Sequence, residues 1–128
     1  MELTYAGAGE LLERYREAWL GFDGDAWVDL FTDDAEYHDG PFDPPIVGRN
    51  ALRAYLLEAS EREGQLDVAF ERHWVVPPTV LAAWHASYVH RATLARVQLV
   101  GFMTLELADD GRVARFREWY HRRETPAE

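Results

Sequence analysis

Hydrophobic residues at the start of the chain follow the period of a helix. Leu11, Leu12, Tyr15, Trp19 and Phe22 would share one side of a helix and predict an amphipathic helix with a broad apolar face. The polar segment Asp23–Asp25 breaks this helix and offers a carboxylate N-cap for a short second one. The inward positions expected in the second helix are Trp27, Leu30 and Phe31.

A short strand, Ala35–Asp39, is predicted after the second helix. Alternation places Ala35, Tyr37 and Asp39 on one face and Glu36 and His38 on the other. If the face with Tyr37 is buried, Asp39 directs a carboxylate into an aromatic interior. That position is costly for a structural residue and useful for a catalytic one.

The middle of the chain is predicted to hold a loop and a third helix. Residues 40–48 are rich in proline and glycine, which is typical of an irregular loop. Asn50 is a good N-cap for the helix that follows, and Gly64 marks its end. The apolar face of this helix carries Leu52, Tyr55, Leu56 and Ala59.

The second half of the chain changes to the alternating period of strands. An Asp-Gly pair at Asp110-Gly111 indicates a tight hairpin between the last two strands. Helices followed by hairpin-linked strands predict an α+β fold, in which helices pack on one side of a curved antiparallel sheet and leave a pocket between the layers. The predicted strands are Leu66–Val76, Val80–Arg91, Arg96–Leu107 and Arg112–Arg123.

Composition restricts the class of protein. A chain of 128 residues with 48% hydrophobic content predicts one domain, residues 1–128, with a substantial core. The formal charge of -10 argues against a nucleic-acid partner, because phosphate binding needs clustered Lys and Arg. No segment approaches the roughly 18 apolar residues of a membrane helix, so we expect no membrane partner. The lack of cysteine and of a leader-like N-terminal segment leads us to expect a cytoplasmic protein.

Three segments of the chain resemble a known family: RYREAWLGFDGDAWVDLFTDDAEYHD, VGRNALRAYL and DDGRVARFREWYHRRE. With the order of elements, they resemble the nuclear-transport-factor-2-like superfamily, and within it the SnoaL-like and ketosteroid-isomerase branch. The resemblance covers nearly the whole chain. It implies a cone-shaped, cystatin-like α+β fold in which three N-terminal helices and the sheet enclose a pocket. It also implies a small hydrophobic ligand, no cofactor and a homodimer.

The resemblance implies roles for three residues. The hydrogen-bond-donating Tyr of ketosteroid isomerase matches Tyr15, and its Asp general base matches Asp39. Limonene epoxide hydrolase carries its general base in an R-D-Y motif on the last strand. The segment Arg117-Glu118-Trp119 is similar, which implies the base role for Glu118.

Two departures from these relatives narrow the chemistry. The isomerase has a second acidic donor on its penultimate strand, whereas residues 101–105 contain no acid. The hydrolase has an Arg and an Asp two residues apart on an inner strand, whereas Ala82–Tyr88 contains neither. Polyketide cyclases of this superfamily use a single acid/base carboxylate, which this chain can provide.

Each candidate catalytic residue also has a structural alternative. Asp39 is either a general base or a cap for the turn at Gly40-Pro41. Glu118 either enters the pocket or faces outward in an ion pair with a neighbouring arginine. Tyr15 is either a hydrogen-bond donor or an aromatic residue that packs the core.

Aromatic residues make up 13% of the chain, and they either pack a ring-rich core or line a cavity. Together they favour a hydrophobic, ring-bearing ligand for the pocket. Large rings on the outer sheet face would instead indicate a dimer interface. The five histidines lack the helical spacing of a zinc site, so we expect no metal. The rings expected to contact the ligand are Trp19, Trp27, Tyr37, Phe42, Trp84, Tyr88, Phe102 and Tyr120.

The leading hypothesis is a cofactor-independent isomerase, cyclase or hydratase that acts on an apolar carbonyl or polyketide-like molecule. Asp39, Glu118 and Tyr15 would carry the acid/base chemistry. The alternative is a non-catalytic domain that binds a hydrophobic ligand or dimerises. An enzyme should place both carboxylates in one dry pocket, whereas a binding module should leave at least one of them exposed or ion-paired.

Overall fold

The computed structural model describes residues 2–128 and contains helices and strands in the predicted order. The helices form mainly in the first half of the chain, and the four long strands follow them. In chain order the elements are α1 (Tyr5–Leu20), α2 (Gly24–Val28), β1 (Phe31–Asp39), β2 (Ile46–Val47), α3 (Arg49–Arg62), β3 (Glu63–Val76), β4 (Thr79–His90), β5 (Arg96–Leu107) and β6 (Val113–Thr125).

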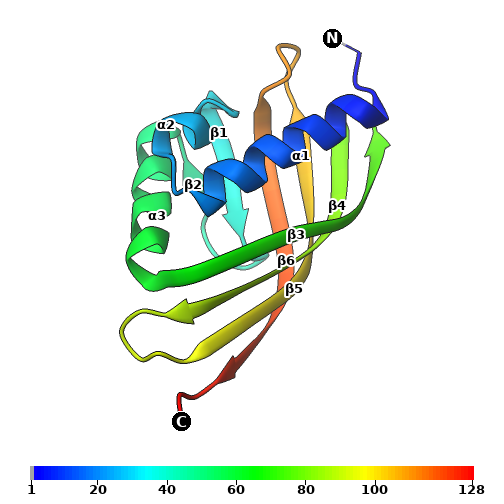
Figure 1. Cartoon of the computed structure of the whole chain (residues 1–128). Helices are drawn as coiled ribbons and strands as arrows, with labels where there is room; N and C mark the ends of the chain where they lie inside the picture. Colours follow the sequence, from blue (N-terminus) through cyan, green and yellow to red (C-terminus); the bar gives the residue numbers. More distant parts are fainter. Residues whose placement is uncertain (1) are drawn as a thin grey trace.

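The strands form one sheet in the order β2-β1-β6-β5-β4-β3. Figure 1 shows the long strands curving beneath α1, with α2 and α3 next to it. This α+β layering confirms the predicted fold class. Neighbouring strands are antiparallel except β1 and β6, which are parallel. The sequence did not predict this parallel pair, because β1 and β6 are far apart in the chain and no hairpin joins them.

Side-chain caps fix the beginnings of α1 and α2. The Gly7 N–H donates to Thr4 Oγ1 at 2.9 Å, and the Ala26 N–H donates to Asp23 Oδ1 at 3.1 Å. The cap predicted at Asp23 is therefore confirmed. A cap of this kind stabilises a helix by about 1 kcal/mol.

Several boundaries differ from the predicted ones. Helix α3 begins at Arg49 with Gly48 at its N-cap, so the predicted cap at Asn50 is wrong. Strand β1 begins at Phe31 rather than at Ala35, and its register with β6 shifts between Phe31 and Glu36. Helix α3 leads directly into β3 at Glu63, so Gly64 belongs to the strand and does not end the helix. A Cβ at Gly64 would lie 3.3 Å from the Val89 carbonyl oxygen, so the close approach of β4 favours glycine at this position.

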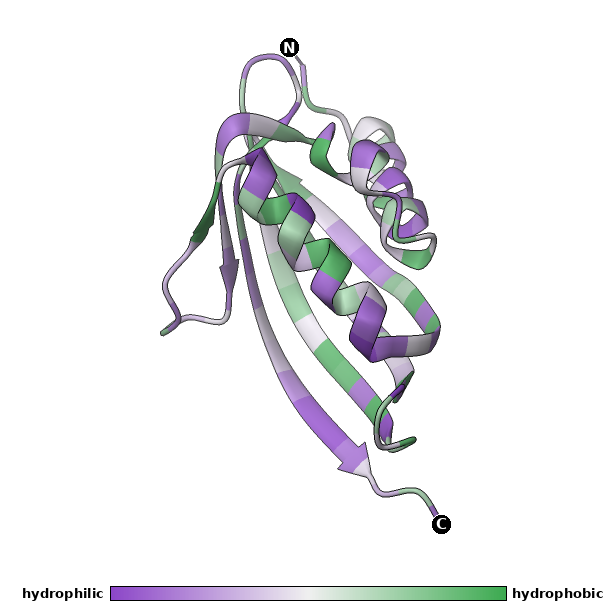
Figure 2. Ribbon diagram, turned by 90° about the vertical axis from the view of Figure 1, so that its left-hand side faces the viewer, coloured by the Kyte–Doolittle hydropathy of each residue, from purple (hydrophilic) through white to green (hydrophobic). Residues whose placement is uncertain are grey.

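The hydrophobic core lies between the helices and the inner face of the sheet. Trp27, Phe31, Leu52 and Phe116 are fully buried there. Figure 2 shows hydrophobic and hydrophilic bands alternating along α3, which presents its hydrophobic side to the sheet. Alternation along β4 puts Ala82, Trp84, Ala86 and Tyr88 on the inner, buried face of the sheet.

The tightest packing on the inner face is at Gly101. Trp84 on β4, Gly101 on β5 and Tyr120 on β6 are neighbours in register. A Cβ on Gly101 would lie 2.8 Å from the Tyr120 Cβ and 3.1 Å from the Trp84 indole, and it would also collide with the Trp119 carbonyl oxygen. The missing side chain therefore lets the Trp84 indole lie close against β5.

We expect the substitution Gly101→Ala to destabilise the fold by about 1–3 kcal/mol, because backbone and ring atoms must move to admit the methyl group. Urea denaturation followed by circular dichroism measures this loss. Gly21→Ala is the matched control, since a Cβ at Gly21 would meet the Glu17 carbonyl oxygen at an ordinary 3.4 Å. Equal stability of both variants and the parent would contradict the close packing at Gly101.

Candidate active site

A cavity of about 310 Å³ lies between the helices and the inner face of the sheet. Its volume is at the small end of the range for small-molecule sites. Three carboxylates and two arginines contribute to its wall: Asp39, Glu63, Glu118, Arg62 and Arg122. Half of the sixteen lining residues are aromatic: Tyr15, Trp19, Trp27, Tyr37, Tyr55, Trp84, Tyr88 and Tyr120.

The parallel pairing of β1 with β6 brings Asp39 and Glu118 together. In this register Tyr37 lies opposite Phe116, and Asp39 lies opposite Glu118. Both carboxylates line the cavity. Two carboxylates this close cannot both ionise without mutual repulsion, so the pair tends to keep one proton.

Glu118 is the more deeply buried member of this pair. Its side chain faces inward with Phe116 and Tyr120, and only 6% of the residue is exposed. Burial raises the pKa of Glu118 well above its ordinary value, and the neighbouring Asp39 carboxylate raises it further. The Tyr37 hydroxyl donates to Glu118 Oε1 at a long 3.5 Å and partly opposes this rise in pKa. The outward-facing alternative for Glu118 is therefore wrong.

Asp39 is half-buried and has a specific hydrogen-bond donor. The Tyr55 hydroxyl on α3 donates to Asp39 Oδ2 at 2.8 Å. This bond orients the Asp39 carboxylate toward the helical wall of the cavity, whereas the cap alternative would have directed it to the Gly40-Pro41 turn.

Tyr15 reaches the acid pair through Tyr37. The two tyrosine hydroxyls are 3.3 Å apart, and the Tyr15 ring is stacked on Phe116 with ring centres 5.6 Å apart. Burial, followed by the charge of Glu118, raises the pKa of both tyrosines well above 10. Both hydroxyls therefore keep their protons at neutral pH, and Tyr15 serves both as core packing and as part of a hydroxyl chain ending at Glu118.

Six of the eight rings expected to contact a ligand line the cavity, and two do not. Phe42 is 98% exposed, because the loop after β1 carries it away from the cavity. Phe102 points to the outer face of the sheet, since its neighbours Gly101 and Met103 face inward. Its ring lies 5.8 Å from that of Trp74. These two expectations are corrected.

Four polar residues of the site were missed from the sequence: Tyr55, Arg62, Glu63 and Arg122. Tyr55 was predicted on the apolar face of the third helix, but its hydroxyl gave no sign of contact with Asp39. Glu63 directly precedes Gly64, where the helix was predicted to end, and it is buried in the cavity wall. No periodicity marks Glu63, because it stands where the helical pattern ends and the strand begins.

The penultimate strand supplies no acid to the cavity. Met103 and Leu105 are the inward residues of β5 in this region and are fully buried, as the sequence departure from ketosteroid isomerase predicts. Glu118 pairs with Met103 in register, so the second acid of the site comes from the adjacent strand β6.

The histidines are dispersed over the fold. His73 stacks on Tyr5 at 4.0 Å on the helix side, whereas His85 bonds to Glu71 at 2.7 Å on the exposed side of the sheet. Within residues 2–128, no group of three or more His, Asp or Glu side chains is arranged to hold a metal ion. No helix in the same range is long and apolar enough to cross a membrane.

We expect the stability of the protein to depend on pH through Glu118. Its pKa is higher in the folded than in the unfolded chain, so the folded state holds the proton more tightly. This stabilisation is complete below about pH 4.5 and is lost as the pH rises through the folded pKa. Glu118→Gln removes this titration. The free energy of unfolding of the variant should therefore rise relative to that of the parent by up to about 1.4 kcal/mol per pH unit in that window.

Thermal unfolding of parent and variant between acidic and neutral pH measures this difference. Glu58→Gln, on the exposed side of α3, is the control and should melt in parallel with the parent. Parallel curves for Glu118→Gln would mean that Glu118 is not held in a dry site.

Comparison with known proteins places this geometry in a family. Residues 12–116 match the family described as SnoaL-like domain, and no curated protein matches the sequence. Similar solved structures include three enzymes or proposed enzymes. One is SalBIII, an epoxide hydrolase/cyclase-like enzyme of pyran ring formation in polyether salinomycin, with 19% identity, coverage of 89% of this chain and 90% of that chain, and a TM-score of 0.78. Another is a proposed SnoaL-like polyketide cyclase from Shewanella denitrificans, with 16% identity, coverage of 89% and 90%, and a TM-score of 0.76. The third is an LEH-like epoxide hydrolase from Mycobacterium tuberculosis, with 22% identity, coverage of 89% and 82%, and a TM-score of 0.74.

At these identities the similarity to solved structures shows the shared fold. The family match covers most of the chain and agrees with the curved sheet, the three helices and the cavity described above. The chain belongs to the SnoaL-like domain family.

Proposed function

We propose that this protein is a cofactor-independent enzyme that moves a proton on an apolar carbonyl or polyketide-like molecule. The observation that carries the proposal is the pair Asp39 and Glu118, held side by side in the wall of a ring-lined cavity. Two carboxyl groups in different surroundings, one fully buried and one half-buried, can supply the acid and the base that proton transfer needs.

The proposed mechanism divides the two roles by environment. Glu118 is buried and keeps its proton, so it donates a hydrogen bond to the carbonyl oxygen of the substrate. Asp39 is oriented by the Tyr55 hydroxyl and removes a proton from the carbon next to the carbonyl. The resulting enolate oxygen is stabilised by Glu118, and Asp39 returns the proton to the same or a conjugated carbon. Return to a different carbon is isomerisation.

The rings of the cavity support an apolar substrate. Trp19, Trp27 and Trp84 line the wall together with tyrosines from α1, α3 and the sheet. These side chains exclude water, which strengthens the electrostatic effect of the acid pair on a bound carbonyl. The similar solved structures named for epoxide and polyketide chemistry agree with small-molecule acid/base catalysis, but they do not specify the reaction.

We expect the protein to accelerate hydrogen–deuterium exchange at the activated carbon of β-tetralone, a bicyclic apolar ketone, in heavy water. Asp39→Asn should reduce the accelerated rate by about 10²–10⁴-fold, because it removes the base and keeps the shape. Proton NMR of the ketone follows the exchange directly. Glu58→Gln is again the exposed control.

Three outcomes decide between the two functions. Accelerated exchange that needs both Asp39 and Glu118 supports the enzyme. Binding of β-tetralone without acceleration would identify a non-catalytic ligand-binding protein. Acceleration that survives Asp39→Asn would contradict the role of Asp39.

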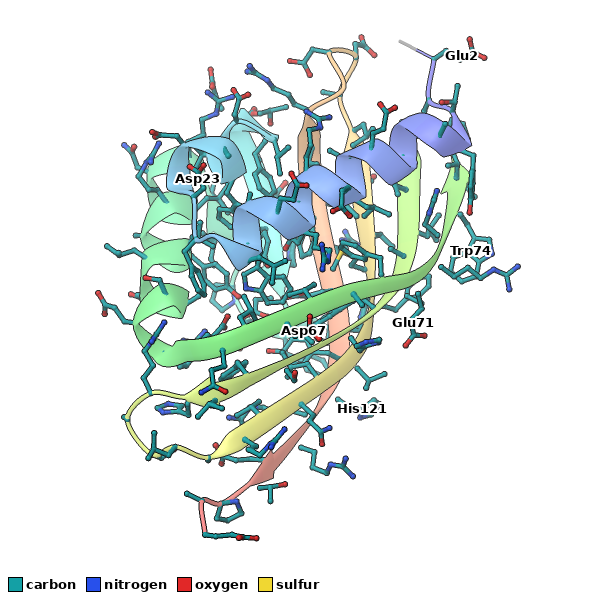
Figure 3. The ribbon with its side chains drawn as sticks, in the orientation of Figure 1. Glu2, Asp23, Asp67, Glu71, Trp74 and His121 are labelled. Carbon is teal, nitrogen blue, oxygen red and sulfur yellow. The ribbon has the colours of Figure 1, made fainter. Side chains whose placement is uncertain are left out.

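We also propose that the protein forms a homodimer through the outer face of the sheet. This face carries Trp74, Val100, Phe102 and Trp119, which are partly or largely exposed, and Val100 is 60% exposed. Figure 3 shows Trp74 projecting from the sheet on the side away from α3. An apolar patch of this kind fits a self-complementary interface about a two-fold axis.

Val100→Asp should convert the dimer into a monomer, because it places a charge in the apolar patch. Analytical ultracentrifugation at tens of micromolar (the order of magnitude for a modest interface) measures the change. Leu57→Asp removes a similarly exposed aliphatic side chain from α3 and should leave the dimer intact. A parent protein that sediments as a monomer would contradict this interface.

A further inference from the structure

Glu63 is a buried carboxylate that the proposed proton transfer does not use. Only 5% of the residue is exposed, and it lines the same cavity as Asp39 and Glu118. It begins β3, the edge strand that is separated from β1 and β6 by β5 and β4. The cavity therefore has a second acidic group, contributed by the opposite edge of the sheet.

The carboxylate of Glu63 is held on two sides. The Trp19 indole N–H on α1 donates to Oε1 at 3.1 Å, and Arg62 lies 3.3 Å from Oε2. An ionised carboxylate offers about four lone-pair positions, so these two contacts leave acceptor capacity for a ligand.

The backbone around Glu63 is also fixed. The Arg91 N–H donates to the Arg62 carbonyl oxygen at 2.9 Å, and Arg91 Nε donates to the Ser60 carbonyl oxygen at 3.0 Å. The hairpin between β4 and β5 thus holds the end of α3 in place. A carboxylate with a fixed backbone and fixed partners is preorganised to read one group of a ligand.

A purely structural role does not account for the charge. A glutamine of the same shape would accept the Trp19 hydrogen bond without burying a carboxylate, and a buried ion pair contributes little net stability. Burial raises the pKa of Glu63, while the Trp19 hydrogen bond and the Arg62 charge oppose this rise. Arg62, 3.3 Å from Oε2, is therefore the charged partner of a carboxyl group that faces the ligand space.

We infer that the ligand of this cavity is bipolar: it presents its carbonyl to Asp39 and Glu118 and a hydroxyl or ammonium group to Glu63. The apolar body between these two ends lies against the aromatic rings. This inference rests on the proposed function for the carbonyl end, and it assigns Glu63 as a specificity-determining residue for the other end. A neutral hydroxyl group and a cationic ammonium group share the property that a carboxylate recognises, because each donates a hydrogen bond.

Four matched probes test the far end of the ligand. They are β-tetralone and its derivatives with a hydroxyl, a methoxy or an aminomethyl group on the aromatic ring, at the carbon farthest from the ketone. Isothermal titration calorimetry should show that the hydroxyl and aminomethyl derivatives bind at least about tenfold more tightly than the methoxy derivative, which has no hydrogen-bond donor at that position.

Glu63→Gln should remove most of the aminomethyl advantage and leave the affinity for unsubstituted β-tetralone within about twofold, since it keeps the shape and loses the charge. Glu61→Gln, two positions earlier and exposed, is the matched control and should change neither value. Asp39→Asn should keep the aminomethyl advantage, because that variant alters the other end of the cavity. The comparison of Asp39→Asn with the parent does not require the Glu63→Gln variant to be stable.

The outcomes separate the two proposals. Equal affinity of the parent for the aminomethyl, hydroxyl and methoxy derivatives would overturn the role of Glu63 and leave the proposed function intact. If Asp39→Asn loses the tighter binding of the aminomethyl derivative, the aminomethyl group lies at the acid pair, which would also overturn the role of Glu63. A uniform loss of affinity for all four probes in Glu63→Gln would mean that Glu63 is structural. Failure of all four to bind the parent would contradict the apolar-carbonyl site itself.

Discussion

The parallel pairing of β1 with β6 is the constraint on which the site depends. Hairpins join β3 to β4, β4 to β5 and β5 to β6, whereas β1 and β6 pair although the rest of the sheet lies between them in the chain. Its register puts Asp39 directly opposite Glu118. A shift of one residue would turn one of these carboxylates to the outer face, because strand side chains alternate. The short β2, paired with β1, and the stacked rings of Tyr37 and Phe116, 4.3 Å apart, hold that register.

The structure gives two nearby acids different surroundings. Glu118 is enclosed by protein, and Asp39 is open enough to keep part of its hydration. Three tyrosines surround them: Tyr37 donates to one acid, Tyr55 donates to the other, and Tyr15 extends the first contact. A hydroxyl group can donate a hydrogen bond to a carboxyl group whether that group is protonated or ionised, and it adds no charge. The three tyrosines can therefore keep their places whichever oxygen of the acid pair carries a proton.

Sequence patterns predicted the elements and the inward faces of the strands well, because both follow from periodicity. The face shared by Ala35, Tyr37 and Asp39 is one example, and the carboxylate cap predicted within residues 23–25, which is Asp23, is another. The patterns were weakest where period changes. Glu63 stands at the change from helix to strand, so neither period assigned it a face. Phe102 followed the alternation of β5, but the expectation of a ligand contact was based on its being aromatic. Tyr55 was correctly placed on its helix, whereas its bond to Asp39 depends on a contact between distant elements.

The separation of β1 and β6 along the chain also affects how the protein can be made. During synthesis the N-terminal helices and β1 leave the ribosome long before β6 exists, and domains tend to fold from the N-terminus as they emerge. Throughout that interval Asp39 has no partner acid, and the wall that would enclose it is incomplete. A nascent or truncated chain that lacks β6 therefore cannot pair Asp39 with Glu118. The acid pair forms only when the last strand is in place, so its presence reports that the whole sheet has been assembled.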